Sequence, residues 1–351
     1  MPFSAQDIQD AGKVGIDFYL GNKPVDQVAL DRPLLKALVA KKKTAPGAKQ
    51  FIVEQLRARY QSNFQWFNGS QIVTYNRRQT IEQANFAWRS AHDGLALDED
   101  RLVQNGIKVT DDSESVATNA EKFQLTNLLE EQSEVLRLGF QEQFSYSLHL
   151  DGSQSPDAIA GLDALISLTP TTGVVGGIDR SLAQNAFWRN NVATGLTTTT
   201  GTGTILNSME VTWRNCMRNG GGKPDLILAG STFLDGYRNF LTNSYGRMDY
   251  GPSGFKTVEA GTETMTFKGV PVQWSPEFAE LDSRYAPATP WEKRCYFINT
   301  SHLKLRPIEG QDMVNRKPPR AYDRYEYYWA ITWRGALTMN MASSMAVLAV
   351  A

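Results

Sequence analysis

Apolar side chains recur at steps of four residues, or multiples of four, between Thr118 and Leu148. Because residues four apart lie on one face of an α-helix, this pattern predicts a single helix with one apolar stripe. The stripe consists of Leu128, Leu136, Phe140, Phe144 and Leu148, flanked by Leu125 and Leu129. Thr118 and Glu121 have the spacing of a capping box. At about 1.5 Å per residue, the helix is expected to be roughly 45 Å long.

Shorter patterns fill most of the remaining chain. Helical spacing predicts helices within Pro33–Lys43, Ile205–Met217 and Thr232–Thr242. Apolar or alternating runs predict strands and turns in Pro224–Ala229, 263–274, 294–307, Tyr322–Met341 and, as a final strand, Ala336–Ala351. This mixture of helices and strands predicts the α+β fold class.

The stretch from Lys49 to Ala91 is rich in strand-forming residues and carries the signature of a long β-hairpin. Asn68-Gly69 is a two-residue turn signal in which both residues must accept a positive φ. Three aromatic residues, Phe64, Trp66 and Phe67, fall at the tip. Because a two-stranded ribbon cannot bury such groups by itself, we expect them to lie on a partner surface. Burial within the same chain is the alternative.

Two glycine-rich stretches are candidate loops. A Walker-type phosphate loop at Gly176-Gly177 would need a further glycine and a Lys at fixed offsets, and neither is present. A turn is therefore favoured, with Phe187 and Trp188 as apolar anchors beyond it. The second stretch, Gly195–Gly203, is rich in β-branched residues that resist helix formation, and we expect it to be mobile or to face an assembly partner.

The composition is that of a globular protein without a strong overall charge. Hydrophobic residues make up 41% of the chain, and the mean hydropathy of -0.37 argues against an integral membrane protein. The net charge of -1 gives no general attraction to nucleic acid or to an anionic membrane. The one local charge run is Lys41, Lys42 and Lys43, which is either a solvated helix end or a contact with nucleic acid or an acidic partner.

The sequence contains only weak signals for a catalytic, cofactor or metal site. His92, His149 and His302 lack the spacing of a helical metal site, and the sequence His92-Asp93-Gly94 favours a turn over an acid–base pair. We therefore predict no catalytic residue, no cofactor and no metal site.

Two further features indicate an intracellular protein with reduced thiols. Cys216 and Cys295 lack the spacing of a zinc site or a disulfide framework. The N-terminal residues lack the basic and apolar regions of a secretory signal, so the chain is expected to stay where it is made.

The order of these elements, together with several local sequences, resembles the major capsid proteins of tailed bacteriophages, which share the Hong Kong 97 fold. The segments that carry the resemblance are Pro33–Val53, Trp88–Ile107, Asn127–Phe140, Gly161–Ser181 with the following Phe187–Asn190, and Gly221–Tyr237. Together they sample most of the chain, and their order and spacing are more specific than any one segment.

The resemblance implies five parts along the chain. These are an N-terminal arm (1–48), an extended β-hairpin loop (49–95), a peripheral domain with a long spine helix (96–152), an axial domain (153–305) and C-terminal strands that return to the peripheral domain (306–351). It also implies a structural protein rather than an enzyme. Many copies would form the hexamers and pentamers of an icosahedral head shell around double-stranded DNA.

The resemblance gives roles to exposed residues. Phe64, Trp66 and Phe67 become candidates for contacts between subunits. Arg77 and Arg78 are candidates for pairing with carboxylates of a neighbouring subunit, with plain solvation as the alternative. The lysine run becomes a candidate contact with packaged DNA or with a scaffolding protein.

The expected partners follow from the same resemblance. They are a separate scaffolding protein, since no long helical prefix precedes the arm, a portal, a decoration protein in some shells, and DNA held weakly on the inner surface; no membrane is involved. The protein is expected in the virion, after assembly in the cytoplasm of the bacterial host. Because Gln50 to Gly106 contains no Lys, a Lys–Asn crosslink from the extended loop is not expected.

Two rival functions stay open at this point. An encapsulin-like nanocompartment shell would share the fold but enclose enzymes instead of DNA. A cytosolic hydrolase that uses His92, Asp93 or His302 is the alternative from another class of protein.

Overall fold

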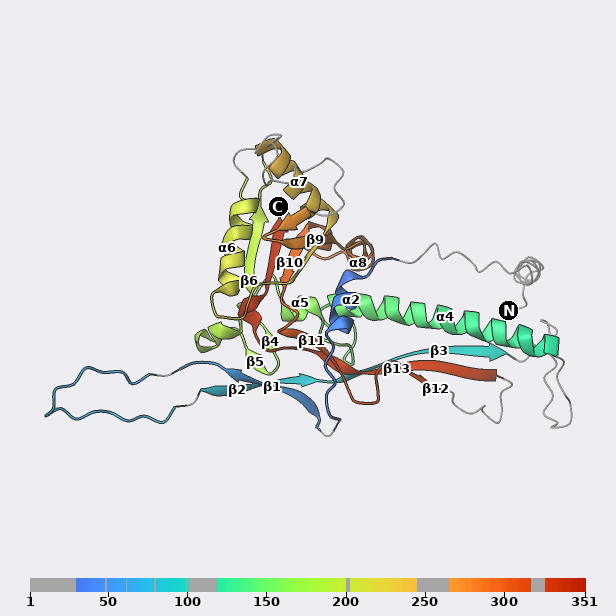
Figure 1. Cartoon of the computed structure of the whole chain (residues 1–351), viewed down its shortest axis with the longest axis horizontal. Coiled ribbons are helices and arrows are strands. Elements are labelled where there is room, and N and C mark those ends of the chain that lie inside the picture. The colour runs from blue at the N-terminus through green and yellow to red at the C-terminus, as the bar shows by residue number, and fades with distance from the viewer. Residues whose placement is uncertain are drawn as a thin grey trace. The chain divides into compact units, whose positions relative to one another are not determined.

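A computed structural model describes residues 30–47, 49–60, 62–78, 80–98, 100, 119–199, 203–244, 265–316 and 326–351 of the chain (Figure 1). These residues fall into two compact units. Unit 1 takes in residues up to 30, 92–140 and 315–331, and unit 2 takes in 31–91, 141–314 and 332–351. Helix α4 (Asn119–His149) and strand β13 (Glu326–Met339) each contribute residues to both units.

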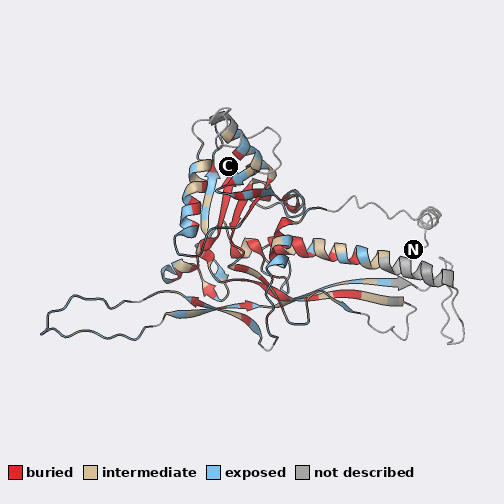
Figure 2. Ribbon diagram, in the orientation of Figure 1, coloured by how far each residue is buried: buried red, intermediate tan, exposed pale blue. Residues whose placement is uncertain are grey.

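Unit 2 is built on a six-stranded mixed sheet in the order β6, β14, β10, β7, β9, β8. Strand β14 runs parallel to β6 and β7 runs parallel to β9, while the other neighbours are antiparallel. The central strands β14, β10 and β7 are buried at every position, which explains their continuous apolar sequences (Figure 2). The bounds are Asn191–Leu196 (β6), Leu226–Ala229 (β7), Met265–Phe267 (β8), Val270–Trp274 (β9), Arg294–Ile298 (β10) and Ala346–Val350 (β14).

Helices α6 (Ile205–Met217) and α7 (Ser231–Ser244) pack on one face of this sheet. Trp213 of α6 lies edge-on to Phe267 and Phe297, with ring centroids 5.6 and 5.8 Å away. The buried side chains of both helices and of the strands form one hydrophobic cluster. The predicted bounds of α6 are confirmed, and those of α7 differ by one or two residues at each end.

Helix α8 (Glu277–Tyr285) contacts the opposite face, where Phe278 lies edge-on to Tyr296 of β10 with 6.0 Å between ring centroids. The sequence pattern predicts only strands and turns here, so this helix was missed. The sequence does contain helix signals here, but they extend over only a few residues. Glu277 and Glu280 stand in the first turn, where the helix dipole favours acidic residues, and the apolar positions have helical spacing.

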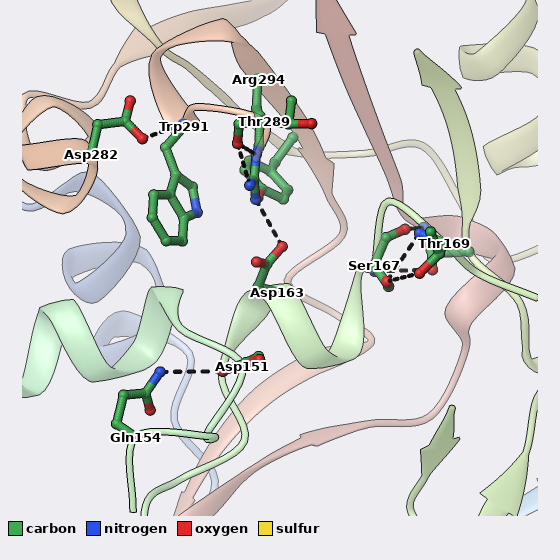
Figure 3. Close-up of polar contacts among 11 residues, drawn as sticks. Asp151, Gln154, Asp163, Ser167, Thr169, Asp282, Thr289, Trp291 and Arg294 are labelled. Atoms are coloured by element: carbon green, nitrogen blue, oxygen red, sulfur yellow. Dashed lines mark hydrogen bonds and ion pairs between the residues drawn. The ribbon is translucent and has the colours of Figure 1, made fainter. Parts of the chain in front are cut away.

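A buried ion pair links helix α5 (Leu162–Leu165) to strand β10 (Figure 3). Arg294, which is 2% exposed, donates to Asp163 Oδ1 at 2.9 Å and to the carbonyl oxygen of Thr289 at 3.0 Å. Burial raises the pKa of Asp163, although the guanidinium acts in the opposite direction. The neighbouring short helix η2 (Trp291–Lys293) places an indole under the same guanidinium.

A second sheet surrounds strand β13, which pairs with β11 (Leu303–Pro307), with β12 (Val314–Arg316) and with β3 (Arg89–Asp98). Strand β3 contains His92-Asp93-Gly94. The turn predicted for these three residues is wrong, because they continue a ten-residue extended strand.

Helix α2 (Pro33–Ala40) packs on β11 and β7 and ends before the lysine run instead of including it. Its buried leucines are Leu34, Leu35 and Leu38. The chain then runs along β11, with the amide of Lys43 donating to Leu305 O at 3.1 Å and that of Ala45 to Pro307 O at 2.8 Å. Residues 1–29 of the expected N-terminal arm lie outside the described residues.

The predicted long helix is confirmed as α4, which has 31 residues. Within its described side chains the apolar stripe is buried at Leu136, Phe140, Phe144 and Leu148. Phe144 packs on Trp333, with 4.6 Å between ring centroids. The capping box and the first leucines of the stripe lie outside the described side chains.

Gly176-Gly177 forms the turn between β4 (Val174–Val175) and β5 (Ile178–Asp179), with φ of +60° and +78°. The predicted turn is therefore confirmed, because both positions need the left-handed region that glycine adopts freely. The short helix η1 (Ala183–Trp188) follows, and its last residue is 1% exposed and donates through Nε1 to Val175 O at 2.9 Å.

The C-terminal end of the chain departs from the expected arrangement. The apolar tail forms two elements, since β13 ends at Met339 and the short helix η3 (Ala342–Ser344) leads into β14. Strand β14 belongs to the six-stranded sheet built by segments within 153–305, whereas residues 306–351 were expected to return to the peripheral domain. Among the described helices, none combines the length and the apolar character that crossing a bilayer requires.

Candidate assembly surface

The stem of the long hairpin is a two-stranded ribbon of β1 (Phe51–Arg57) and β2 (Ile81–Ala87). Ile52 pairs with Phe86, and the buried residues of both strands lie on the same face. The opposite face is exposed along β2.

The buried face of the stem is anchored to the rest of unit 2. The amide of Asn85 donates to Gly176 O at 2.8 Å. Glu54 accepts from Arg306 Nη2 at 2.8 Å and from Thr338 Oγ1 at 3.1 Å. These contacts fix the base of the hairpin.

The ladder between the two strands stops soon after Arg57 and Ile81, and residues 62–68 and 72–78 form no strand. A turn closes the hairpin, with the amide of Gln71 donating to Asn68 O at 2.8 Å. The turn is confirmed, but the predicted form is wrong. Its central residues are 69 and 70, one position later than the Asn68-Gly69 signal places them, and neither Asn68 nor Gly69 has a positive φ.

The hairpin tip, residues 60–78, carries the most exposed large apolar side chains of the described structure. Their exposed fractions are 77% for Tyr60, 75% for Phe64, 89% for Trp66, 66% for Phe67, 97% for Ile72 and 89% for Tyr75. The alternative of burial within the same chain is thus wrong for Phe64, Trp66 and Phe67. Tyr60, Ile72 and Tyr75 were missed, although they flank the same turn in the sequence.

Exposed aromatic groups in such number are unusual on an isolated protein. Phe64 and Trp66 contact each other edge to face at 5.2 Å between centroids, which covers only a small part of either ring. Burying one large apolar side chain contributes roughly 1.5–3 kcal/mol. Six of them would contribute on the order of 10 kcal/mol before the costs of association. The tip therefore exposes more apolar surface than a single soluble chain usually leaves open to water.

Arg77 and Arg78 are exposed and lie on the returning side of the tip. In the part of the chain that the structure describes, neither guanidinium has an ion-pair partner. Pairing with carboxylates of a second chain stays a prediction.

The lysine run is held by carboxylates of its own chain. Lys41 Nζ lies 2.6 Å from Asp225 Oδ2 and 2.6 Å from Thr300 Oγ1, and Lys42 Nζ pairs with Asp312. Burial alone would raise the pKa of Asp225, but the hydrogen bonds from Lys41 and Thr300 outweigh it and lower the pKa. Lys43 is exposed. A contact of this run with DNA or a scaffold stays a prediction.

The histidines are not assembled into a site. His92 is exposed on β3, and His149 is buried at the end of α4. The imidazole of His302 lies between Asn340 Oδ1 at 2.7 Å and Gly221 O at 2.9 Å. Among the described residues, no group of three or more His, Cys, Asp and Glu side chains could hold a metal ion.

The two cysteines are unsuited to nucleophilic chemistry. Cys216 and Cys295 are both free and fully buried. Burial raises the pKa of both thiols, to about 12 for Cys216, so neither forms a thiolate at neutral pH. Both pack in the hydrophobic cluster of the six-stranded sheet.

Comparisons with known proteins give different results by sequence and by structure. No protein-family model matches the sequence, and no curated protein matches it either. Solved structures match over nearly the whole chain. The capsid asymmetric unit of cyanophage A-1(L) aligns with 96% of this chain and 98% of its own, at a TM-score of 0.58 and 15% identity.

Further structures give the same result. The capsid of Myoviridae phage XM1 covers 95% of this chain and 98% of its own, at a TM-score of 0.58 and 12% identity. A chain of Mycobacterium phage Bobi covers 100% of this chain and 99% of its own, at a TM-score of 0.54 and 10% identity. The chain has the Hong Kong 97-like fold of phage capsid proteins. At 10–15% identity these structures share the fold with this chain. The predicted α+β class is confirmed with it.

Proposed function

We propose that this chain is the structural major capsid protein of a tailed phage, and that its copies close an icosahedral shell around double-stranded DNA. The observation that carries the proposal is the hairpin tip, a set of six exposed apolar side chains on an anchored stem. Support also comes from capsid structures that align with more than nine-tenths of the chain. In this account the protein acts by assembly, and no residue turns over a substrate.

In the proposed shell, the tip of each subunit lies on a neighbouring copy within hexamers and pentamers. Trp66 and Phe67 are the central contacts, and Arg77 and Arg78 pair with carboxylates at the edge of the same interface. Each contact is modest, but each subunit meets several neighbours, so the contributions add up over a closed shell.

Further partners are part of the proposal. A scaffolding protein, a portal and, in some shells, a decoration protein would join the assembly in the bacterial cytoplasm, and the finished shell would be the virion capsid. Packaged DNA would touch the inner surface weakly, since the chain has a net charge of only -1. The extended loop would form no Lys–Asn crosslink, because Gln50 to Gly106 contains no Lys.

The rival functions have less support. Solved structures that resemble the chain carry the names of phages and of a GTA particle, which favours a phage shell over an encapsulin-like compartment. A hydrolase that uses His92, Asp93 or His302 is disfavoured because, within the described residues, the hydrogen-bond partners of His302 are the Asn340 side chain and the Gly221 carbonyl oxygen, and neither is a nucleophile.

The mass of the purified protein tests the proposal. We expect particles far above the 39.1 kDa of one chain by light scattering, and closed shells of uniform diameter by negative-stain microscopy. Nuclease-resistant DNA inside particles from infected cells would distinguish a phage head from an enzyme compartment. A species that stays at 39.1 kDa at high concentration would contradict shell formation.

A further inference from the structure

Three segments of unit 2 meet at a buried polar cluster: Arg32 just before α2, the last turn of α4, and the first residue of α8. His149 Nε2 lies 4.0 Å from Glu277 Oε2, and Arg32 Nε lies 3.8 Å from Glu277 Oε1. Both distances exceed hydrogen-bond length. Within the described residues none of these four atoms has a hydrogen-bond partner, although His149 and Glu277 are fully buried. Such groups are rare in folded proteins and call for a physical reason.

The position of one hydrogen follows from the other ring nitrogen of His149. Its Nδ1 lies 2.9 Å from the backbone carbonyl oxygen of Ser145. Because a carbonyl oxygen only accepts, Nδ1 carries a hydrogen. In a neutral ring Nε2 is then an acceptor that faces the carboxyl group of Glu277. Two acceptors repel each other unless one of them holds a proton, so the geometry requires one proton on this pair.

Charged groups surround the pair from all three segments. Glu142 of α4 lies 3.7 Å from Arg32 Nη2 and 3.6 Å from Arg284 Nη2, so it bridges two cations. The hydroxyl group of Ser145 faces the Glu277 carboxyl group. The remaining titratable neighbours are Asp31, Glu280 and Tyr146. On its other side, the ring of His149 lies edge-on to Phe278, so the pair is closed to solvent.

We propose that His149 and Glu277 form a protonation latch, which holds the segment before α2 against α4 and α8 while the pair carries one proton. The latch weakens when the pair gains a second proton or loses the only one. This inference goes beyond the proposed function and does not depend on it, because all the residues belong to one chain.

The pKa values of the two groups support the latch. Burial lowers the pKa of His149 from its ordinary 6.5 to about 4. Burial also raises the pKa of Glu277 from 4.5 to about 7, although Ser145 and Arg32 favour the ionised carboxylate. Both shifts have the same cause, since a solvent-excluded site disfavours charge.

Each residue alone would make folding depend on pH, and the two dependences are opposite. The stability that neutral His149 contributes to the folded state is complete above pH 6.5 and is lost as the pH falls toward 4. The stability that protonated Glu277 contributes to the folded state is complete below pH 4.5 and is lost as the pH rises toward 7. Between pH 4.5 and 6.5 the two slopes cancel, because the folded and the unfolded pair both hold one proton in total.

Single substitutions should reveal the two opposite pH dependences of stability that cancel in the native pair. We would measure amide hydrogen exchange of the full chain by mass spectrometry, with peptides from α2 reporting the latch and peptides from β7 correcting for the intrinsic effect of pH. In His149→Gln only Glu277 titrates, so opening of α2 should increase with pH by up to about tenfold per unit. In Glu277→Gln only His149 titrates, so opening should decrease with pH by a similar factor.

The matched control is Glu280→Gln, which removes an exposed carboxyl group from the same helix. It should keep the flat profile of the native protein between pH 4.5 and 6.5. Slopes of opposite sign in the two latch variants support the proposal. Flat profiles in both, or slopes of the same sign, would overturn it.

A measurement on the native protein covers the case in which a variant does not fold. At pH 6 an ordinary carboxyl group is ionised, so the infrared carbonyl stretch of a protonated carboxylic acid reports a group such as Glu277. We expect this band to be present at pH 6 and to disappear as the pH passes 7. With a pKa of about 7 for Glu277 and about 4 for His149, the pair holds its proton on Glu277 at pH 6, so absence of the band at this pH would refute the latch.

Discussion

Gly176 and Gly177 stand at neighbouring positions of one turn but differ in their surroundings. Both have a positive φ. A Cβ atom on Gly176 would lie 3.0 Å from Ala84 Cβ and 3.2 Å from Phe86 Cζ, whereas a Cβ atom on Gly177 would meet nothing within 4 Å. The first glycine therefore provides both the turn and the close packing of strand β2, and the second provides only the turn.

This difference predicts unequal effects of two alanine substitutions. Gly177→Ala should lower the free energy of unfolding by about 1 kcal/mol, the cost of a left-handed conformation for a residue with a Cβ atom. Gly176→Ala should lower it by at least twice as much, because the added methyl group also displaces β2. Urea unfolding of both variants measures the difference. Equal effects would show that the stem does not press on this turn.

The two glycines and His149 mark how far single residues can be understood from sequence. A turn at Gly176-Gly177 follows from the residues themselves, because a glycine pair between apolar segments has few other uses. The contact with Ala84 does not, since it joins residues almost a hundred positions apart. His149 likewise shows nothing unusual in sequence, and only burial beside Glu277 gives it a function.

At the scale of elements, periodicity succeeds where an element is long or wholly buried. Helix α4 and helix α6 repeat their apolar positions often enough to be predicted, and β7 is a continuous apolar run. Helix α8 has nine residues, too few for its period to stand out. The hairpin tip was predicted to continue the two-stranded ladder because its composition favours strands, but its described residues form no strand.

Strand β14 shows why topology is harder than element type. The sequence predicts a final buried strand, and Leu348 is fully buried as expected. The choice of sheet depends on the partners β6 and β10, which no local pattern specifies.

The central place of β14 can be tested by substitution. Leu348→Ala should lower the free energy of unfolding by roughly 2–5 kcal/mol, because it leaves a cavity in the core of the sheet. Val192→Ala on the neighbouring edge strand is the control, since its side chain is 37% exposed. Urea unfolding should show a much smaller effect for the control. Similar effects in both variants would place β14 outside the core.

At the scale of the whole molecule, the account depends on the surface that the chain leaves open. The hydrophobic cluster of the six-stranded sheet buries its side chains almost completely, while the tip exposes Trp66 and Ile72 almost completely. A chain that can build such a core has no need to expose aromatic residues for its own folding. Under the proposed function, a second copy of the chain covers this surface.

The most direct test of this claim is the assembly of a tip variant. Trp66→Ala combined with Phe67→Ala removes two exposed aromatic groups, and Gln65→Ala changes an exposed polar neighbour as the control. We predict that the double variant keeps the circular dichroism spectrum of the native chain but sediments as small species, while the control forms particles like the native protein. Normal particles from the double variant would contradict the account.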